Sequence, residues 1–300
     1  MLFLYIISEE INLKQSEKWK RGLPYVGNKG QKAEKIIDIL PAGNRLIDVF
    51  GGGGSISLTA ACSGKWGEVV YNDRRKTVVN LLKALIEDKP HFDLMKYVYM
   101  DRETFCNWRD NMPDSIERTL VLTAWSFGNN LHDYLWGKKT EKEKLLATRA
   151  LLSGNTGTQL DGLYSYAKNE TTISGKYTVY HKWRRNRLEQ LERLQQLERL
   201  QQLQQLQQLE FLTFDYRSLE IEPEDVVYCD PPYTGTGEEY DGFNDDAFQS
   251  WLAKCPEKQI YISEYTQLPH TEVAFVLGKK QSFQAKGKRP EELLLKYVKD

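Results

Sequence analysis

Metal-binding and disulfide-forming residues are scarce in this sequence. Four cysteines and four histidines occur among 300 residues, and neither type forms the close pairs that zinc knuckles, redox dithiols or helix-borne metal sites need. The cysteines are Cys62, Cys106, Cys229 and Cys255, and the histidines are His91, His132, His181 and His270. We therefore expect metal-free chemistry in a reducing compartment, the cytoplasm.

Long apolar runs and a strong net charge are also absent. The apolar run at 2–7 is too short to span a bilayer and no basic region precedes it, so we expect neither a signal peptide nor a membrane anchor. A formal net charge of −1 argues against nucleic-acid binding through bulk positive charge. Basic residues are instead clustered near aromatic ones at 18–35, 182–187 and 279–289, where each cluster fits a solvated surface as well as a phosphate contact.

Short runs of β-branched and aromatic residues are present and predict buried strands at 45–50, 68–71, 210–214, 225–230 and 259–263. Between the first two runs, a glycine cluster leads into small residues at 55–63 that suit a helix. Apolar residues recur at helical spacing at 76–87. This alternation predicts a right-handed βαβα unit and an α/β fold with a parallel sheet.

The segment 91–187 interrupts this pattern with Trp, Tyr, Asn, Gly and charged residues, and has helix-like pieces at 116–126 and 141–152. We interpret it as a mainly helical insertion. The sheet domain would then comprise 13–90 and 210–300, with a leucine repeat at 188–209 between the insertion and the second part.

The repeat places leucine at every third position from 188 to 212, with Gln, Glu and Arg between. Three residues turn an α-helix by about 300°, so the leucines spiral around it and make a poor coiled-coil seam. All four residue types favour helices, which predicts an α-helix of about 20 residues. We expect a spacer packed on the core at one end, with an oligomerisation rod as the alternative.

The strongest chemical signal is Asp230-Pro231-Pro232-Tyr233, which directly follows a predicted buried strand. Such a strand delivers the motif to the carboxyl edge of the sheet, where open α/β sheets bind ligands. The Asp230 carboxylate and the Pro231 carbonyl are two acceptors for the hydrogens of an exocyclic amine, and Tyr233 offers a ring on which a flipped base can stack. The motif therefore predicts chemistry on the amine of a nucleobase.

A second signal is the loop Asp48-Val49-Phe50-Gly51-Gly52-Gly53-Gly54-Ser55 at the end of the first predicted strand. Glycines allow close backbone approach to a ligand, and the following helix offers free N–H groups. Asp73 ends the second strand, where an acid in this topology holds ribose hydroxyls. Because no Gly-Lys-Ser/Thr follows, a nucleoside-bearing cofactor is favoured over a nucleotide phosphate.

The order of these motifs resembles that of the Dam-like, alpha-group N6-adenine DNA methyltransferases, including their phage and prophage members. That family has an aromatic-x-Gly-x-Lys segment, a D-x-F-x-G-x-G loop, an intervening recognition region and then DPPY. The matching residues here are Tyr25, Gly27 and Lys29, then Asp48, Phe50, Gly52 and Gly54, and finally 230–233. The resemblance implies a Rossmann-like sheet that binds S-adenosyl-L-methionine, with an inserted target-recognition domain.

The resemblance also implies residue roles. Tyr25 and Lys29 would border the cofactor, Phe50, Gly52 and Gly54 would line its methionyl end, and Asp73 would bind its ribose. Gly27 and Asp48 would also belong to the cofactor site. Phe214-Asp215-Tyr216 is similar to the segment that contacts the cofactor adenine. Catalysis would belong to Asp230, Pro231, Pro232 and Tyr233, with no metal. These roles describe methyl transfer to N6 of a flipped adenine by in-line attack.

For DNA contacts, the segment from Trp125 to Asn130 with Tyr134 resembles the family's aromatic-Gly-aromatic-Asn segment, although Asn129 stands where an aromatic is usual. We expect Asn129, Asn130 and Tyr134 to lie beside DNA, and Lys182, Arg184 and Arg185 to contact phosphates. The expected partner is double-stranded DNA, with a cognate restriction endonuclease as a candidate second partner. We expect a monomer or a weak dimer.

The same residues also bear on three other methyltransferase reactions and on a role without catalysis. Cytosine-C5 methylation is excluded because it needs a nucleophilic cysteine in a Pro-Cys dipeptide, whereas Cys255-Pro256 has the reverse order. An N4-cytosine or an RNA methyltransferase acting on a similar amine stays open, although the large insertion favours DNA. A scaffold organised by the leucine repeat is the alternative that involves no enzyme.

Overall fold

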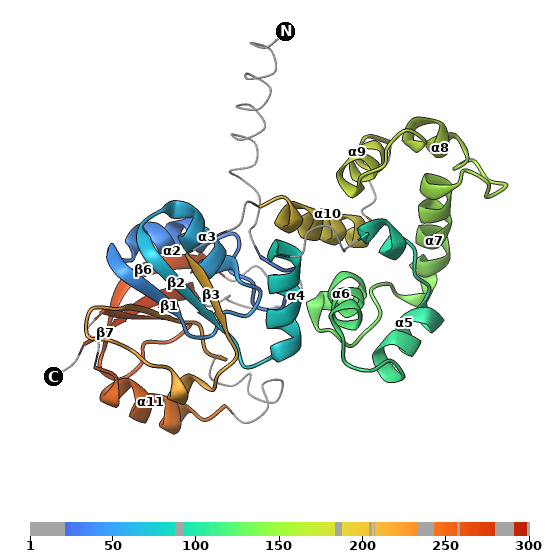
Figure 1. Ribbon diagram of the computed structural model, residues 1–300. Helices are drawn as coiled ribbons and strands as arrows, with labels where there is room; N and C mark the ends of the chain where they lie inside the picture. The colour runs from blue at the N-terminus through green and yellow to red at the C-terminus, as the bar shows by residue number, and fades with distance from the viewer. Residues whose placement is uncertain are drawn as a thin grey trace, which may run out of the picture.

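A seven-stranded sheet forms the centre of the sheet domain in the computed structural model (Figure 1). The structure describes residues 22–87, 93–183, 188–203, 206, 208–232, 243–256, 259–279 and 291–298. The strand order is β3-β2-β1-β4-β5-β7-β6, with β1 to β5 parallel and β7 antiparallel to both of its neighbours. The strands are β1 Gly43–Asp48, β2 Trp66–Asn72, β3 Leu209–Leu212, β4 Val226–Cys229, β5 Gln259–Glu264, β6 Thr271–Lys279 and β7 Glu291–Tyr297.

All five predicted strands are confirmed as β1 to β5, and the predicted α/β class is confirmed with them. Strands β6 and β7 were missed. In β6, Val273 and Val276 are both 43% exposed and the register shifts twice along its pairing with β7, so this strand has no regular buried face to detect. An edge strand with exposed apolar residues and bulges resembles a loop in sequence.

Helices cover both faces of the sheet. Successive residues of a strand point to opposite faces, so Leu46 and Val69 pack on the side of α2 and α3, while Ile47 and Val70 pack on the side of α11. The helices of this domain are α2 Ala33–Ile39, α3 Ser55–Ser63, α4 Lys76–Glu87 and α11 Asp245–Lys254. The predicted helices at 55–63 and 76–87 are confirmed with the same bounds.

The insertion is helical, as expected. It contains α5 Arg102–Asp110, α6 Ile116–Trp125, α7 Lys138–Leu152, α8 Gly162–Ala167 and α9 Ile173–Trp183, together with the 3₁₀ turns η2 Leu94–Tyr97 and η3 Phe127–Asn129. Figure 1 shows these helices beside the sheet domain, with α4 and α10 between the two. One hydrophobic cluster runs from the sheet through α4 and α10 into the insertion. The domain boundaries drawn from the sequence stay a prediction.

The leucine repeat forms α10 Glu189–Gln201, which is shorter than the predicted helix. The expectation that it packs at one end was wrong. Leucines 188, 191, 194, 197 and 200 are all fully buried. Helix α10 contacts α6, α9 and η2 of the insertion as well as α4 of the sheet domain.

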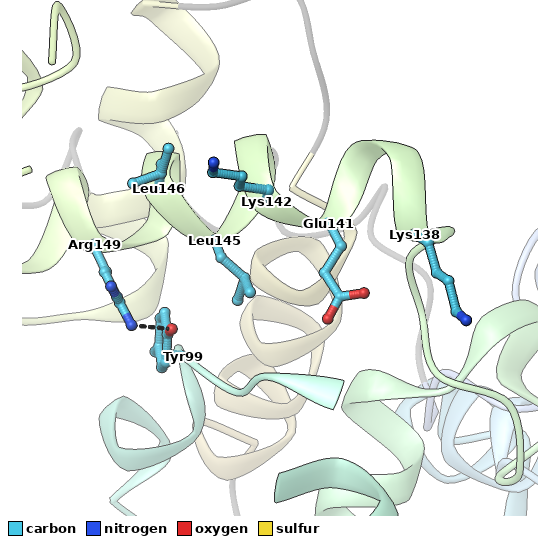
Figure 2. A pocket seen from close by; sticks show the side chains of 7 residues that line it. All are labelled: Tyr99, Lys138, Glu141, Lys142, Leu145, Leu146 and Arg149. Carbon is cyan, nitrogen blue, oxygen red and sulfur yellow. Dashed lines mark hydrogen bonds between the residues drawn. The ribbon is translucent and has the colours of Figure 1, made fainter. Parts of the chain in front are cut away.

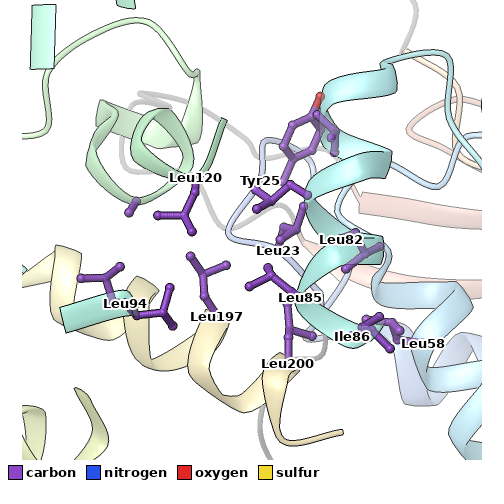
Figure 3. Packing of buried hydrophobic residues seen from close by; sticks show 14 of the residues in the cluster. Leu23, Tyr25, Leu58, Leu82, Leu85, Ile86, Leu94, Leu120, Leu197 and Leu200 are labelled. Atoms are coloured by element: carbon purple, nitrogen blue, oxygen red, sulfur yellow. The ribbon is translucent and has the colours of Figure 1, made fainter. Parts of the chain in front are cut away.

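The spacing of three explains how every leucine is buried. Each step rotates the leucine by about 60° around the helix, so the five leucines cover about 240°. Such a helix needs apolar partners on several sides. Figure 3 shows Leu197 and Leu200 of α10 beside Leu85 of α4, with Leu94 and Leu120 of the insertion lining the same cluster.

Polar side chains of α10 bind both halves. Glu189 accepts hydrogen bonds from Lys144 Nζ (2.6 Å) and Trp136 Nε1 (3.0 Å) in the insertion. Arg193 donates to the backbone oxygens of Ala124 and Ser126 at the end of α6, and Gln196 donates to the carbonyl of Gly22 in the sheet domain. The repeat is therefore one structural link between the insertion and the sheet domain, beside the direct contact of α4 with α6.

Candidate active site

The glycine loop joins β1 to α3 at the carboxyl edge of the sheet. Its backbone is tied to the end of β2, because Gly51 N–H donates to the Asn72 carbonyl (2.7 Å) and Tyr71 Oη donates to the Gly52 carbonyl (2.7 Å). Gly52 N–H donates to Asp73 Oδ2 (2.9 Å), so the predicted ribose-binding acid lies against the loop. The structure thus brings the glycine loop and Asp73 into contact, whereas the sequence shows only that one follows the other along the chain.

Gly54 has a structural reason to be glycine. Its φ is +79°, and a Cβ added there would lie 2.4 Å from Cδ2 of Leu82 in α4. Gly52, with φ +49°, differs because an added Cβ would have its nearest protein atom, in the Tyr25 ring, at 3.6 Å. Gly54 therefore serves helix packing, whereas Gly52 leaves backbone and space open in front of the loop.

We predict that Gly54→Ala lowers the free energy of unfolding by about 2–4 kcal/mol, combining left-handed backbone strain with overpacking against Leu82. Gly64→Ala is the matched control, since Gly64 has φ +67° and an added Cβ meets no atom within 4 Å. Its cost should be about 1–2 kcal/mol, from backbone strain alone. Urea denaturation of both variants measures the difference, and equal losses would contradict the Leu82 contact.

Asp48 is a buried carboxylate at the end of β1. Ser57 Oγ donates to its Oδ2 (2.5 Å), while its Oδ1 has no hydrogen-bond partner among the described residues. The pKa of Asp48 is raised to about 7, mainly by burial and also by the nearby charge of Asp230, against the lowering effect of the Ser57 hydrogen bond. An unsatisfied buried acceptor of this kind suits a ligand that brings an N–H donor or a positive charge.

Aromatic rings form a wall beside the loop. The Phe50 ring lies 5.3 Å from that of Tyr216 and 5.9 Å from that of Phe243, measured between centroids. Tyr216 belongs to the predicted segment 214–216, so the structure joins this segment to the glycine loop. Phe243 was not identified from the sequence, where an isolated Phe before α11 has no motif around it.

Asp215, next to Tyr216, is held by a neighbour on its own turn. Arg217 donates to both carboxylate oxygens, at 2.8 and 2.9 Å, and this bonding lowers the pKa of Asp215 to about 2. Asp215 is therefore ionised at neutral pH. Its carboxylate retains capacity to accept further hydrogen bonds, because each oxygen has two lone pairs.

The segment around Tyr25 covers the loop from the other side. Leu23 N–H donates to the Gly53 carbonyl (2.7 Å), and Arg75 donates to Tyr25 Oη. Asn28 stabilises the turn, since its Oδ1 accepts from Gly30 N–H (2.6 Å) and Ser55 Oγ (2.7 Å). Asn28 and Arg75 were missed in the sequence because each acts through a partner distant along the chain.

Asp230 follows β4 at the same edge of the sheet. Strand β4 pairs with β1, and Val49 N–H donates to the Tyr228 carbonyl (2.9 Å), so the two strand ends lie side by side. Lys29 Nζ lies 2.6 Å from Asp230 Oδ2, and the two side chains are 7% and 16% exposed. Lys29 and Asp230 are brought together from positions 201 residues apart.

Pro231 is buried and Pro232 is half-buried. Tyr233 lies outside the described residues. The described part of the motif therefore ends with the carboxylate and the two prolines at the sheet edge, next to the glycine loop.

The sequence pattern of the D12 class of N6 adenine-specific DNA methyltransferases matches residues 25–254. The chain belongs to this class. The match includes the glycine loop, the insertion and Asp230, and it decides for adenine N6 over cytosine N4 and for DNA over RNA. A search among curated proteins found no match to the chain.

The enzyme is thus an adenine-specific DNA methyltransferase that uses S-adenosylmethionine. The described residues fit this cofactor. Asp48 offers an unsatisfied buried acceptor, Gly52 leaves space before the loop, and the Phe50 and Tyr216 rings offer a wall for a planar base. These three features suit a cofactor with a charged amino-acid end and an adenosine.

In the insertion of this methyltransferase, the structure changes one predicted role. Tyr134 is 6% exposed, donates from Oη to the Met100 carbonyl (2.9 Å) and packs against Trp125 and Phe105. Its ring is part of the insertion core, and a buried ring cannot lie beside DNA as expected. The aromatic pattern around it reflects packing.

The neighbouring loop of the methyltransferase exposes other residues. Phe127 is 55% exposed, and Asn129 and Leu131 have positive φ values of 60° and 61°. Asn130 is exposed, and its Oδ1 accepts from the backbone N–H groups of His132 and Asp133. The predicted phosphate contacts Lys182, Arg184 and Arg185 lie outside the part of the chain whose side chains are described.

A separate cavity of about 330 Å³ lies in the insertion, between α7 and Tyr99. Figure 2 shows Tyr99 facing α7, where Arg149 donates to its hydroxyl (2.7 Å). The lining residues are Tyr99, Lys138, Glu141, Lys142, Leu145, Leu146 and Arg149. The cavity shares no residue with the methyltransferase site at the sheet edge.

Within the described ranges, no helix of the enzyme combines the length and hydropathy needed to cross a bilayer. The same ranges hold no cluster of three or more His, Cys, Asp or Glu side chains arranged for a metal ion.

Proposed function

We propose that the Asp230 carboxylate and the Pro231 carbonyl accept the two N6 hydrogens of a flipped adenine in double-stranded DNA. The observation that carries this proposal is the position of Asp230. It lies at the carboxyl end of β4, directly beside the glycine loop of β1 and under the Lys29 segment. A base amine bound there is next to the site that fits the methyl donor.

The chemistry follows from the electronic structure of adenine. Its N6 lone pair is delocalised into the ring and is weakly nucleophilic. Two fixed acceptors that bind both hydrogens favour a tetrahedral nitrogen with an exposed lone pair, aligned for in-line attack. S-adenosylmethionine supplies an activated methyl group when bound. Pro232 fixes the following backbone, and we assign Tyr233 to stacking on the flipped base.

We propose cofactor roles for the predicted residues that surround the loop. Asp48 faces the charged amino-acid end, because its Oδ1 is buried and unsatisfied. Asp73 accepts from the ribose hydroxyls, since its carboxylate lies at the loop edge. The other proposed cofactor residues are Tyr25, Gly27, Lys29, Phe50, Gly52, Asp215 and Tyr216, while Gly54 supports the cofactor loop indirectly through its packing on Leu82.

For DNA we propose contacts through Asn129, Asn130, Lys182, Arg184 and Arg185. The basic residues at 182–185 of the sequence have the charge for phosphate contacts that set the register of the duplex, and Asn130 is exposed in its loop. We further propose a cytoplasmic monomer or weak dimer of phage or prophage origin, with a cognate restriction endonuclease as its functional partner. The resemblance of the motifs to those of such enzymes supports this assignment.

A base-analogue experiment tests the acceptor pair. Sequencing DNA from a host that expresses the protein first identifies the methylated sequence. Duplexes are then prepared with purine, which lacks the N6 amine, or 2,6-diaminopurine, which keeps it, at the target adenine. The purine duplex should bind at least about tenfold more weakly, because two desolvated acceptors lose their donors.

The 2,6-diaminopurine duplex is the control for a changed base at this position, and it should still be methylated. Affinity is measured by fluorescence anisotropy in the presence of a non-reactive cofactor analogue. Equal affinity for adenine and purine duplexes would contradict the proposed role of Asp230 and Pro231.

A further inference from the structure

A chain of four alternating charges extends from Asp230 into the sheet. Lys29 Nζ lies 2.6 Å from Asp230 Oδ2 and 3.7 Å from Glu292 Oε1, and Lys32 Nζ lies 2.7 Å from Glu292 Oε2. The order is carboxylate, ammonium, carboxylate, ammonium. Its members come from both ends of the chain, and Glu292 lies beyond the residues 25–254 that match the family.

Glu292 is a buried charge in the antiparallel part of the sheet. It lies in β7, opposite Gly278 of β6, and is 5% exposed. Its Oε2 accepts a hydrogen bond from Lys32, whereas its Oε1 has no hydrogen-bond partner within the described part of the chain and faces the Lys29 ammonium. A buried carboxylate with one unsatisfied oxygen is costly unless a nearby cation compensates it.

Lys29 therefore lies between two carboxylates, one in the proposed catalytic motif and one in β7. An ammonium bound to a single carboxylate withdraws acceptor strength from it, because its N–H groups and its charge occupy the oxygen lone pairs. A second carboxylate on the far side shares that charge. The balance between the two contacts decides how much acceptor strength Asp230 keeps for a third group.

We propose that Glu292 is a positioning residue for methyl transfer: it draws the Lys29 ammonium away from Asp230 when the adenine amine binds. Before the base binds, Lys29 holds the Asp230 carboxylate in place. When the base binds, Lys29 moves off the Asp230 carboxylate, and the freed oxygen accepts the N6 hydrogen. This inference rests on the proposed role of Asp230. It adds a residue of β7 to a site whose motifs all lie earlier in the chain.

Glu292→Gln tests the proposal, because the amide keeps the shape and removes the charge. We expect kcat to fall about tenfold, since Lys29 then remains on Asp230, while the KM for DNA and the Kd for cofactor change by less than about twofold. Glu292→Asp keeps the charge and should recover most of kcat. Glu291→Gln, on the same strand with an exposed side chain, should retain wild-type kcat.

Thermal denaturation and cofactor titration of each variant separate positioning from folding. A Glu292→Gln enzyme with wild-type kcat would overturn the proposal. So would a parallel loss of kcat, cofactor affinity and melting temperature that Glu292→Asp does not restore. If Asp230→Asn is inactive while Glu292→Gln is unaffected, only this inference fails; if Asp230→Asn stays active, the proposed function fails first.

Discussion

Replacing Asp230 with Asn is expected to reduce kcat for methyl transfer by about 10²- to 10³-fold while the affinity for S-adenosylmethionine changes by less than about threefold. The amide replaces one acceptor oxygen with an NH₂ donor, which would face the N6 hydrogens of the base. The carboxylate lies beside the glycine loop and forms no part of it, so the cofactor site should persist.

Single-turnover transfer of labelled methyl groups to duplex DNA gives the rate, and isothermal titration gives the cofactor affinity. Asp246→Asn is the control, because Asp246 is exposed in the first turn of α11. In the Asp230→Asn variant, Lys29 still has the Glu292 carboxylate at 3.7 Å to compensate its charge, which should preserve the fold. Equal loss of cofactor binding and transfer would show that Asp230 serves the cofactor.

Deleting residues 192–197, two leucine triplets, is expected to abolish activity and to lower the free energy of unfolding by at least about 4 kcal/mol. Because leucine recurs at every third position, the residues after the deletion can occupy the positions of the deleted ones, and α10 can form again. Residues 202–208 join α10 to β3, however, and a shift of six leaves a single residue to span that distance. Either the core-facing end of α10 or the pairing of β3 with β2 must be lost.

The spacer interpretation predicts the opposite result, with activity and mass in solution unchanged. Urea denaturation, methyl transfer and light scattering after size exclusion measure all three properties. Leu197→Ala should by itself cost about 2–5 kcal/mol, since Leu197 is fully buried. Gln202→Ala is the matched control because its side chain is exposed. Full activity of the deletion would restore the spacer interpretation.

Local patterns predicted most of the sheet. The five parallel strands and the helices at 55–63 and 76–87 have short periodic or apolar signals bounded by turn residues, and these depend on neighbours within one element. Strands β6 and β7 lack this signal because their partners are each other and β5, and because β6 is an edge. Their alternation is broken by the two register shifts.

The site was predicted in part for the same reason. Asp48, Gly52, Gly54, Asp73 and Asp230 follow strands or form the glycine loop, and the carboxyl ends of parallel strands meet at one edge. Side chains that act through distant partners were missed. Asn28, Arg75 and Phe243 have no pattern around them, and each is recognised only by the group it contacts.

By itself, the sequence determined the α/β class, the order of the motifs and the adenine-methylating activity, because each depends on short stretches of chain. Tertiary structure decided the rest. It enclosed Leu188 and the four leucines of α10 between two halves, buried Tyr134 in the insertion core and placed Glu292 against Lys29. These outcomes depend on burial and on charges brought together across some 260 positions, which no local pattern encodes.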